Sequence, residues 1–101
     1  VVEVPVDGAK EFSVYHNFVI YADDRDSLMQ ALGNQGIDTK IHYPVLLHLQ
    51  PAAANLGYKN GDFPVAEALA KKMMSLPIYP ELQQDEIDSV ILAIREFYGK
   101  N

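Results

Sequence analysis

The chain has 101 residues, contains no cysteine and carries a formal net charge of -6 at pH 7. This negative charge opposes binding to nucleic acid and to anionic membrane surfaces, and the absence of thiols excludes disulfides and thiolate metal sites. An apolar share of 49% is typical of a folded protein, and the length suits a single domain with one modest core.

The first predicted elements are two strands. Residues 2–6 alternate weakly around Pro5, which favours an edge strand because proline cannot donate to a ladder. Residues 13–21 are rich in β-branched and aromatic side chains and give the strongest strand prediction in the chain. One face of this strand would carry Val14, His16, Phe18 and Ile20.

A helix is predicted next, and a further strand after it. Asp23 or Asp24 can cap the helix, which runs to about Gln35, because a short carboxylate accepts from the free amides of the first turn. Gly36 can take the left-handed conformation that ends a helix, and residues 37–43 then alternate as a strand. The helix would bury Leu28, Met29 and Leu32.

The second half of the chain predicts helices joined by irregular segments. These are a short helix over residues 48–55, a loop over 56–61, a helix capped by Asp62, an extended segment over 76–80 and a last helix over about 84–98. The helix after Asp62 would bury Val65, Ala66, Leu69, Ala70 and Met73. The last helix would bury Ile87, Val90, Ile91, Ile94 and either Phe97 or Tyr98.

Neither a membrane span nor a secretory leader is predicted. No apolar run approaches the roughly 20 residues that cross a bilayer, and the start has no basic region or cleavage pattern. The chain opens directly on a strand-like pattern without methionine. We therefore expect the first residue to lie inside a longer polypeptide.

Polar side chains gather between Gly36 and Pro51. Lys40, His42, Tyr43 and His48 lie on a segment that two prolines stiffen, and such segments often carry ligand sites. The histidine spacing assembles no zinc site, and neither a nucleophile elbow nor a glycine-rich phosphate loop occurs.

Simpler roles remain open for each of these side chains. His16 on an apolar strand face could be a hydrogen-bonded core histidine, and Lys40 a solvated charge beside a strand. Tyr43 could be a packed aromatic residue, whereas His42 and His48 flank a rigid turn and fit a structural or a functional role equally well. The residues alone therefore predict a small α/β domain with a polar site near residues 40–50.

Residues 36–52 read GIDTKIHYPVLLHLQPA and closely resemble a signature segment of the DegT/DnrJ/EryC1/StrS sugar aminotransferases. Further blocks resemble the same family in the same order: VYH and FVI between residues 14 and 20, LGY at 56–58, GDFPVAE at 61–67 and SLPIYPEL at 75–82. The likeness extends over about residues 12–98. Leu46-Leu47 departs from the proline that often precedes the second histidine, which weakens assignment to a subfamily.

The resemblance implies that residues 1–101 are the C-terminal small domain of a fold-type-I enzyme that depends on pyridoxal 5'-phosphate. The implied fold is an α+β two-layer domain with a small antiparallel or mixed sheet covered by helices. The implied reaction moves an amino group from L-glutamate to a keto group of a nucleotide-linked sugar, with 3-keto sugars favoured over 4-keto sugars by the HYP sequence. A cytoplasmic homodimer is expected.

The family's cofactor-binding lysine belongs to a large domain that this chain lacks, so the resemblance implies no catalytic residue here and an inactive chain when alone. It places His42, Tyr43 and His48 near the mouth of the active site, with Lys40 able to offset diphosphate charge. His16 would pack in a strand or support the site through a hydrogen bond to another side chain. Two alternatives stay open: a non-catalytic binding module with this fold, and a sugar dehydratase of the same family in which histidine replaces the lysine.

Overall fold

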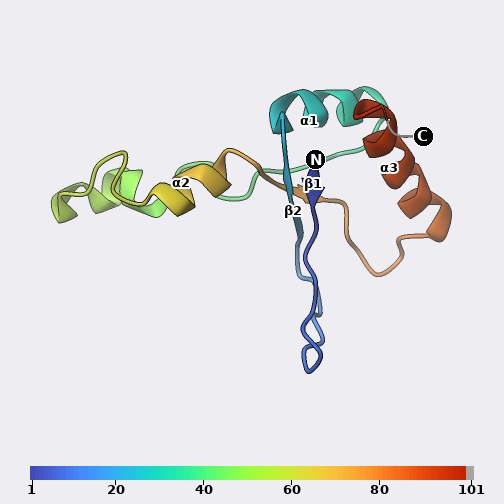
Figure 1. Cartoon of the computed structure of the whole chain (residues 1–101), viewed down its shortest axis with the longest axis horizontal. Helices are drawn as coiled ribbons and strands as arrows, with labels where there is room; N and C mark the ends of the chain where they lie inside the picture. Colours follow the sequence, from blue (N-terminus) through green and yellow to red (C-terminus); the bar gives the residue numbers. More distant parts are fainter. Residues whose placement is uncertain (100–101) are drawn as a thin grey trace.

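A three-stranded antiparallel sheet forms the centre of the computed structural model, which describes residues 1–99 (Figure 1). The central strand β2 (Phe18–Ala22) pairs with β1 (Val2–Glu3) on one side and with β3 (Met73–Leu76) on the other. Helices accompany the sheet, so the predicted α+β class with a small antiparallel sheet is confirmed.

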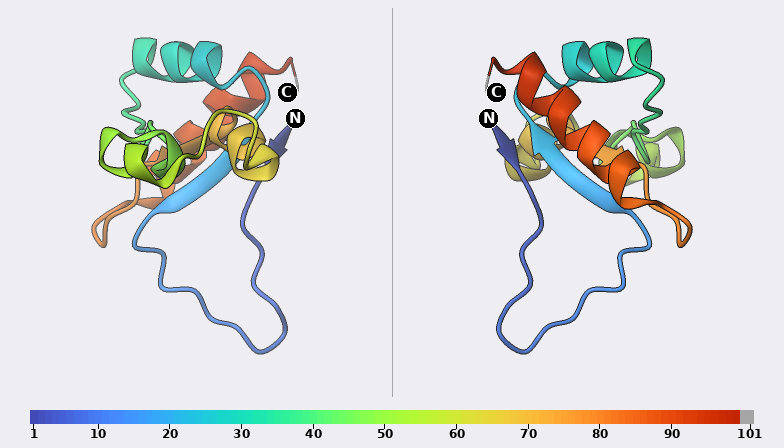
Figure 2. Two further views of the ribbon diagram at one scale, coloured as in Figure 1. Left: turned by 90° about the vertical axis from the view of Figure 1, so that its left-hand side faces the viewer. Right: turned by 90° about the vertical axis from the view of Figure 1, so that its right-hand side faces the viewer.

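The helices divide between the sheet and a separate lobe. Helices α1 (Arg25–Asn34) and α3 (Gln84–Phe97) lie beside the sheet and contact each other. The outer lobe, residues 47–70, contains the 3-10 helices η1 (Leu47–Leu49) and η2 (Pro51–Leu56) and helix α2 (Pro64–Ala70). Figure 1 shows this lobe projecting away from the sheet, and Figure 2 shows helix α3 lying beside β2. Within residues 1–99, no helix combines the length and apolar character needed to span a bilayer.

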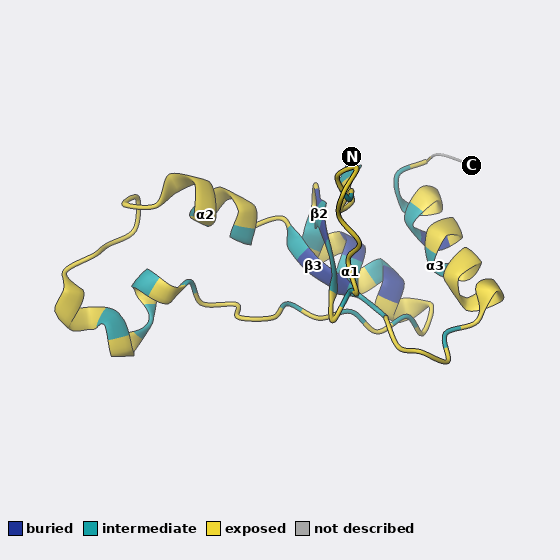
Figure 3. Ribbon diagram, turned by 90° about the horizontal axis from the view of Figure 1, so that it is seen from below, coloured by how far each residue is buried: buried dark blue, intermediate teal, exposed yellow. Residues whose placement is uncertain are grey.

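The hydrophobic core lies between one face of the sheet and the two neighbouring helices (Figure 3). Its buried members are Ile20, Ala22, Leu28, Leu32, Met74 and Ala93. Directly paired residues of an antiparallel sheet point to the same face, so the pairs Phe18–Leu76 and Ile20–Met74 belong to the core face. The pair Val19–Ser75 therefore belongs to the opposite face, which we call the outer face.

Part of the predicted strand over residues 13–21 is not a strand. Phe18 and Ile20 lie on the core face as predicted, but Val14 and His16 belong to an exposed arm, residues 4–17, that joins β1 to β2. The ladder stops because β1 offers only two residues and β3 ends before Pro77. Strand propensity cannot extend a ladder that has no partner.

The predicted strand over residues 37–43 is also wrong. Of these residues only Lys40 pairs with the sheet, through a single bridge to Ser75. The segment then turns at Tyr43, whose backbone has φ 57°, and Pro44 follows. A positive φ and a proline both interrupt strand pairing. Residues 37–43 therefore form an extended connection and not a strand.

The second half differs from the prediction around helix α2. The helix is preceded by Phe63 and begins at Pro64, while Asp62 accepts a hydrogen bond from the Lys59 amide (2.8 Å) without capping it. Val65 and Leu69 are exposed, because nothing in residues 1–99 packs over that side of the lobe. Met73, predicted in this helix, starts β3. The predicted short helix over 48–55 is replaced by η1 and η2.

Helices α1 and α3 agree better with the sequence. Leu28 and Leu32 are fully buried, and Gly36 has the predicted positive φ of 78°. Helix α3 begins with a capping box between Gln83 and Glu86. Its predicted stripe is only partly buried, because Ile87, Val90, Ile91 and Ile94 line an open apolar groove of about 680 Å³ between the helix and the sheet.

Asp23 was predicted as a cap but makes an ion pair instead. Its carboxylate accepts from Lys72 Nζ (2.7 Å), and this hydrogen bond and the charge of Lys72 lower the pKa of Asp23 below 3.8. Asp24 precedes α1 with φ 52° and makes no side-chain cap bond.

A depressed carboxyl pKa stabilises the folded state above pH 3.8, and this stabilisation is lost as pH falls from 3.8 through the lowered pKa of Asp23. We expect Lys72→Met to reduce the fall in stability over that window, measured as urea midpoints at several pH values. Lys71→Met is the matched control, and an unchanged pH profile in Lys72→Met would contradict the role of this pair.

Candidate functional site

The structure separates the predicted site residues into three places. Lys40 and His42 meet Ser75 at the free edge of β3, His48 is buried in the outer lobe, and His16 lies on the arm. Tyr43 follows His42 and is exposed. The spacing in the sequence suggested one site around residues 40–50, but the structure joins only Lys40 and His42.

Ser75 organises the first of these places. Its amide donates to the Lys40 carbonyl (2.7 Å), and its carbonyl accepts from the Lys40 amide (3.1 Å). The Ser75 hydroxyl lies 2.9 Å from His42 Nδ1. One serine thus fixes the backbone before His42 and also one nitrogen of its ring.

The side chains next to this serine remain accessible. Lys40 Nζ is 3.1 Å from Asp38 Oδ2, but both side chains are largely exposed, so the pair is weak and can exchange for another anion. Tyr43 is 82% exposed and sits on left-handed backbone. His42 is therefore held at the edge of the sheet by Ser75, and the accessible Tyr43 follows it directly in the chain.

His48 is enclosed by the outer lobe. Its ring lies 4.8 Å from the ring of Phe63, which in turn packs against Tyr58 at 5.0 Å. His48 Nε2 is 3.7 Å from Glu67 Oε2, with only 8% and 13% of the two side chains exposed. This distance is too long for a hydrogen bond, and the nitrogen has no other partner within residues 1–99. His48 is thus shielded from any ligand in this arrangement.

Glu67 holds the loop around His48 through hydrogen bonds to the backbone. One carboxylate oxygen accepts from the Gly61 amide (2.7 Å) and the other from the Phe63 amide (3.0 Å). Neither Glu67 nor Ser75 was singled out from the sequence by residue type. Both lie in segments that resemble the family blocks GDFPVAE and SLPIYPEL, which was the available signal.

The arm carries His16 away from the other histidines, and His16 is exposed rather than packed in the core. The arm is closed on itself by Asp7, whose carboxylate accepts from the Ser13 amide (3.0 Å) and hydroxyl. The Ser13 hydroxyl and amide lower the pKa of Asp7. Tyr15, the residue before His16, has a left-handed backbone (φ 49°).

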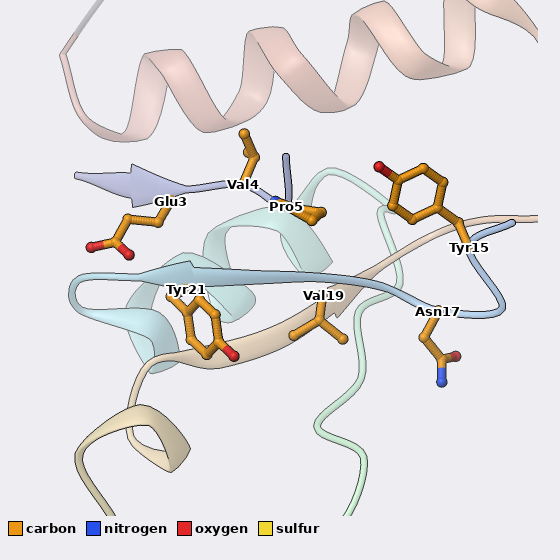
Figure 4. A pocket seen from close by; sticks show the side chains of 7 residues that line it. All are labelled: Glu3, Val4, Pro5, Tyr15, Asn17, Val19 and Tyr21. Atoms are coloured by element: carbon orange, nitrogen blue, oxygen red, sulfur yellow. The ribbon is translucent and has the colours of Figure 1, made fainter. Parts of the chain in front are cut away.

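A shallow pocket of about 290 Å³ opens on the sheet beside the arm (Figure 4). In this view Asn17, Val19 and Tyr21 extend from β2 and the residue before it toward the same side. By the strand register, Val19 and Tyr21 share the outer face with Ser75. The outer face thus presents mixed polar and aromatic groups, while the core face is apolar.

The described lysines do not suit a pyridoxal phosphate site. Such a site needs a sheltered lysine that can form a Schiff base. The lysines within residues 1–99 are all exposed: Lys10, Lys40, Lys59, Lys71 and Lys72. No three histidine, aspartate or glutamate side chains of residues 1–99 converge on a common metal position.

Comparison with known proteins gives one consistent result. The model of the DegT/DnrJ/EryC1/StrS aminotransferase family matches residues 1–95. The chain is 47% identical to the Pleiotropic regulatory protein of Geobacillus stearothermophilus over 92% of this chain and 24% of that protein. It is 40% identical to the dTDP-3-amino-3,4,6-trideoxy-alpha-D-glucose transaminase of Streptomyces venezuelae over 93% of this chain and 25% of that protein.

Solved structures of aminotransferases have the same fold as this chain. DesV of S. venezuelae superposes with a TM-score of 0.89 at 38% identity, over 99% of this chain and 27% of that one. An aminotransferase of Brucella abortus gives 0.89 at 37% identity with the same coverage. The chain therefore spans about a quarter of the length of the relatives it matches.

Proposed function

The chain belongs to the DegT/DnrJ/EryC1/StrS aminotransferase family, a family of pyridoxal-phosphate-dependent enzymes, and we propose that it forms the C-terminal small domain of a nucleotide-sugar aminotransferase. The observation that carries this proposal is the joint match of sequence and fold. Residues 1–95 fit the family, and nearly the whole chain superposes on one quarter of solved aminotransferases.

The proposed reaction moves an amino group from L-glutamate to the 3-keto group of a nucleotide-linked sugar. The names of several relatives support the position on the sugar. They include a dTDP-3-amino sugar transaminase, a UDP-N-acetyl-3-dehydro-glucosamine 3-aminotransferase and a UDP-2-acetamido-2-deoxy-3-oxo-glucuronate aminotransferase. Pyridoxal phosphate, when bound, supplies the electron sink for this chemistry.

Residues outside this chain would hold the cofactor, because the described lysines are exposed and the chain spans a quarter of its relatives. This chain would contribute to binding of the sugar nucleotide. His42 and Tyr43 are accessible and could orient hydroxyl or phosphate oxygens, and Lys40 could offset phosphate charge. The enclosed His48 and the exposed His16 would support the surrounding structure.

Exposed apolar side chains support docking of this domain against further polypeptide. The lobe leaves Leu47, Leu56 and Val65 exposed, and large exposed apolar side chains that gather on one surface usually mark an interface. A cytoplasmic homodimer is the proposed assembly.

A non-catalytic role is the second candidate. Two relatives with high identity carry regulatory names, the Pleiotropic regulatory protein and the Erythromycin biosynthesis sensory transduction protein EryC1. A domain of this fold could keep the accessible His42 and Tyr43 for ligand binding without transfer of an amino group.

The visible absorption spectrum of the protein expressed from its full natural reading frame tests the proposal. We expect an absorption band of bound pyridoxal phosphate that bleaches when L-glutamate is added and returns with a nucleotide-linked 3-keto sugar. A colourless protein that does not respond to pyridoxal phosphate would refute the enzyme and favour the binding role. A coloured protein that ignores L-glutamate would point to a dehydratase.

A further inference from the structure

Ser75 is the one polar residue among residues 1–99 that is buried as a whole, with 6% of its surface exposed. It lies in β3 opposite Val19, so its hydroxyl points to the outer face and away from the core. On the edge of β3 away from β2, the amide and the carbonyl of Ser75 each make a hydrogen bond with the backbone of Lys40. The serine is therefore fixed in position, and its hydroxyl has little access to water.

The hydroxyl of Ser75 has one partner among residues 1–99, His42 Nδ1 at 2.9 Å. A serine hydroxyl can donate one hydrogen bond and accept others. If His42 donated to Ser75, the buried hydroxyl proton would have no acceptor, and an unsatisfied buried donor is costly. The satisfied arrangement has the Ser75 hydroxyl donating to Nδ1.

A neutral histidine that accepts at Nδ1 carries its proton on Nε2. His42 is exposed, and within residues 1–99 its ring makes one hydrogen bond, through Nδ1 to Ser75, which leaves Nε2 free for another partner. The geometry then offers an N–H donor to a ligand that approaches from solvent. The other two histidines lack this arrangement, since His48 is enclosed by the lobe and His16 has no side-chain partner within residues 1–99.

We propose that Ser75 is a positioning residue that holds His42 in the Nε2–H tautomer, so that His42 donates a hydrogen bond to an acceptor oxygen of the sugar nucleotide. The identity of the ligand rests on the proposed function. The tautomer rests only on the contacts of Ser75 and can be measured independently. Oxygens that fit such a donor are a keto oxygen, a hydroxyl or a diphosphate oxygen.

The tautomer is tested by NMR of the full-length holoenzyme labelled with ¹⁵N-histidine, with His42→Gln used to assign the signals. We expect an unprotonated Nδ1 and a protonated Nε2 for His42 in the wild-type protein. Ser75→Ala should give averaged signals from both tautomers, and Ser75→Thr, which keeps the hydroxyl, should restore the wild-type pattern. A protonated Nδ1 in the wild-type protein would overturn the proposal, even if Ser75→Ala failed to fold.

Steady-state kinetics test whether the tautomer of His42 affects binding of the sugar nucleotide. Ser75→Ala should raise KM for the nucleotide-linked keto sugar about tenfold, the effect of one neutral hydrogen bond. The half-reaction with L-glutamate contains no sugar and should be unchanged. Ser89→Ala, a change at an exposed serine of α3, is the matched control.

Equal losses in both half-reactions of Ser75→Ala would mean that the serine has only a structural role and would overturn the proposal. A wild-type protein without transamination would instead refute the proposed function. The NMR result would still decide whether Ser75 sets the tautomer of His42, so the two failures are distinguishable.

Discussion

Leu28→Ala is expected to lower the free energy of unfolding by about 2–5 kcal/mol, the range for removing a fully buried leucine side chain. Leu28 has no exposed surface and lies where α1 meets the sheet. Within residues 1–99, six residues form the buried core. A domain of this size is stable by about 5–15 kcal/mol, so one cavity would remove a large part of its stability.

Urea unfolding followed by circular dichroism measures this effect. Leu47→Ala makes the same chemical change at a side chain that is 79% exposed and serves as the matched control. We expect the midpoint to fall strongly for Leu28→Ala and to stay near the wild-type value for Leu47→Ala. Equal midpoints for the two variants would show that α1 does not pack on the sheet as described.

Glu67→Ala is expected to loosen the outer lobe while leaving the sheet intact. The change removes the acceptor of the Gly61 and Phe63 amides and a carboxylate that lies 3.7 Å from the buried His48 ring. Losing these contacts should cost about 1–3 kcal/mol of local stability. Since each 1.4 kcal/mol is a factor of ten, hydrogen exchange at these two amides should accelerate by roughly 10- to 100-fold.

Glu96→Ala on the exposed side of α3 is the control, and Glu67→Gln should show a smaller effect because its amide keeps one oxygen acceptor. Exchange at core amides such as that of Ile20 should be unchanged in Glu67→Ala. Unchanged exchange at Gly61 and Phe63 would contradict the role of Glu67, and equal acceleration throughout the chain would show that the lobe does not open independently.

Several elements could be predicted because their signals are local. Helix α1 follows from the spacing of Leu28 and Leu32, and Gly36 ends it because glycine takes a positive φ at little cost. Helix α3 follows from its amphipathic period, although its apolar residues next to the groove are only partly covered. The α+β class and the family also follow from the sequence, the latter through the ordered blocks of residues 14–82.

The wrong predictions concern the pairing of strands and the capping of helices. Residues 13–17 and 37–43 alternate like strands, but a strand needs a partner, and the short β1 and β3 offer none beyond a few residues. Met73 fitted the helical spacing after Pro64 and instead pairs with Tyr21. Asp23 had the chemistry of a cap, yet Lys72, far away in the sequence, provides a stronger partner for its carboxylate.

The sequence by itself determined the family, the fold class, the two helices beside the sheet and the polar character of residues 40–48. Tertiary structure alone decided which of those polar side chains meet. His42 rests on Ser75 and remains accessible, whereas His48 lies enclosed against Glu67, although the two histidines are close in the chain. The physical reason is that hydrogen-bond partners from distant segments fix each ring, and spacing along the chain does not reveal those partners.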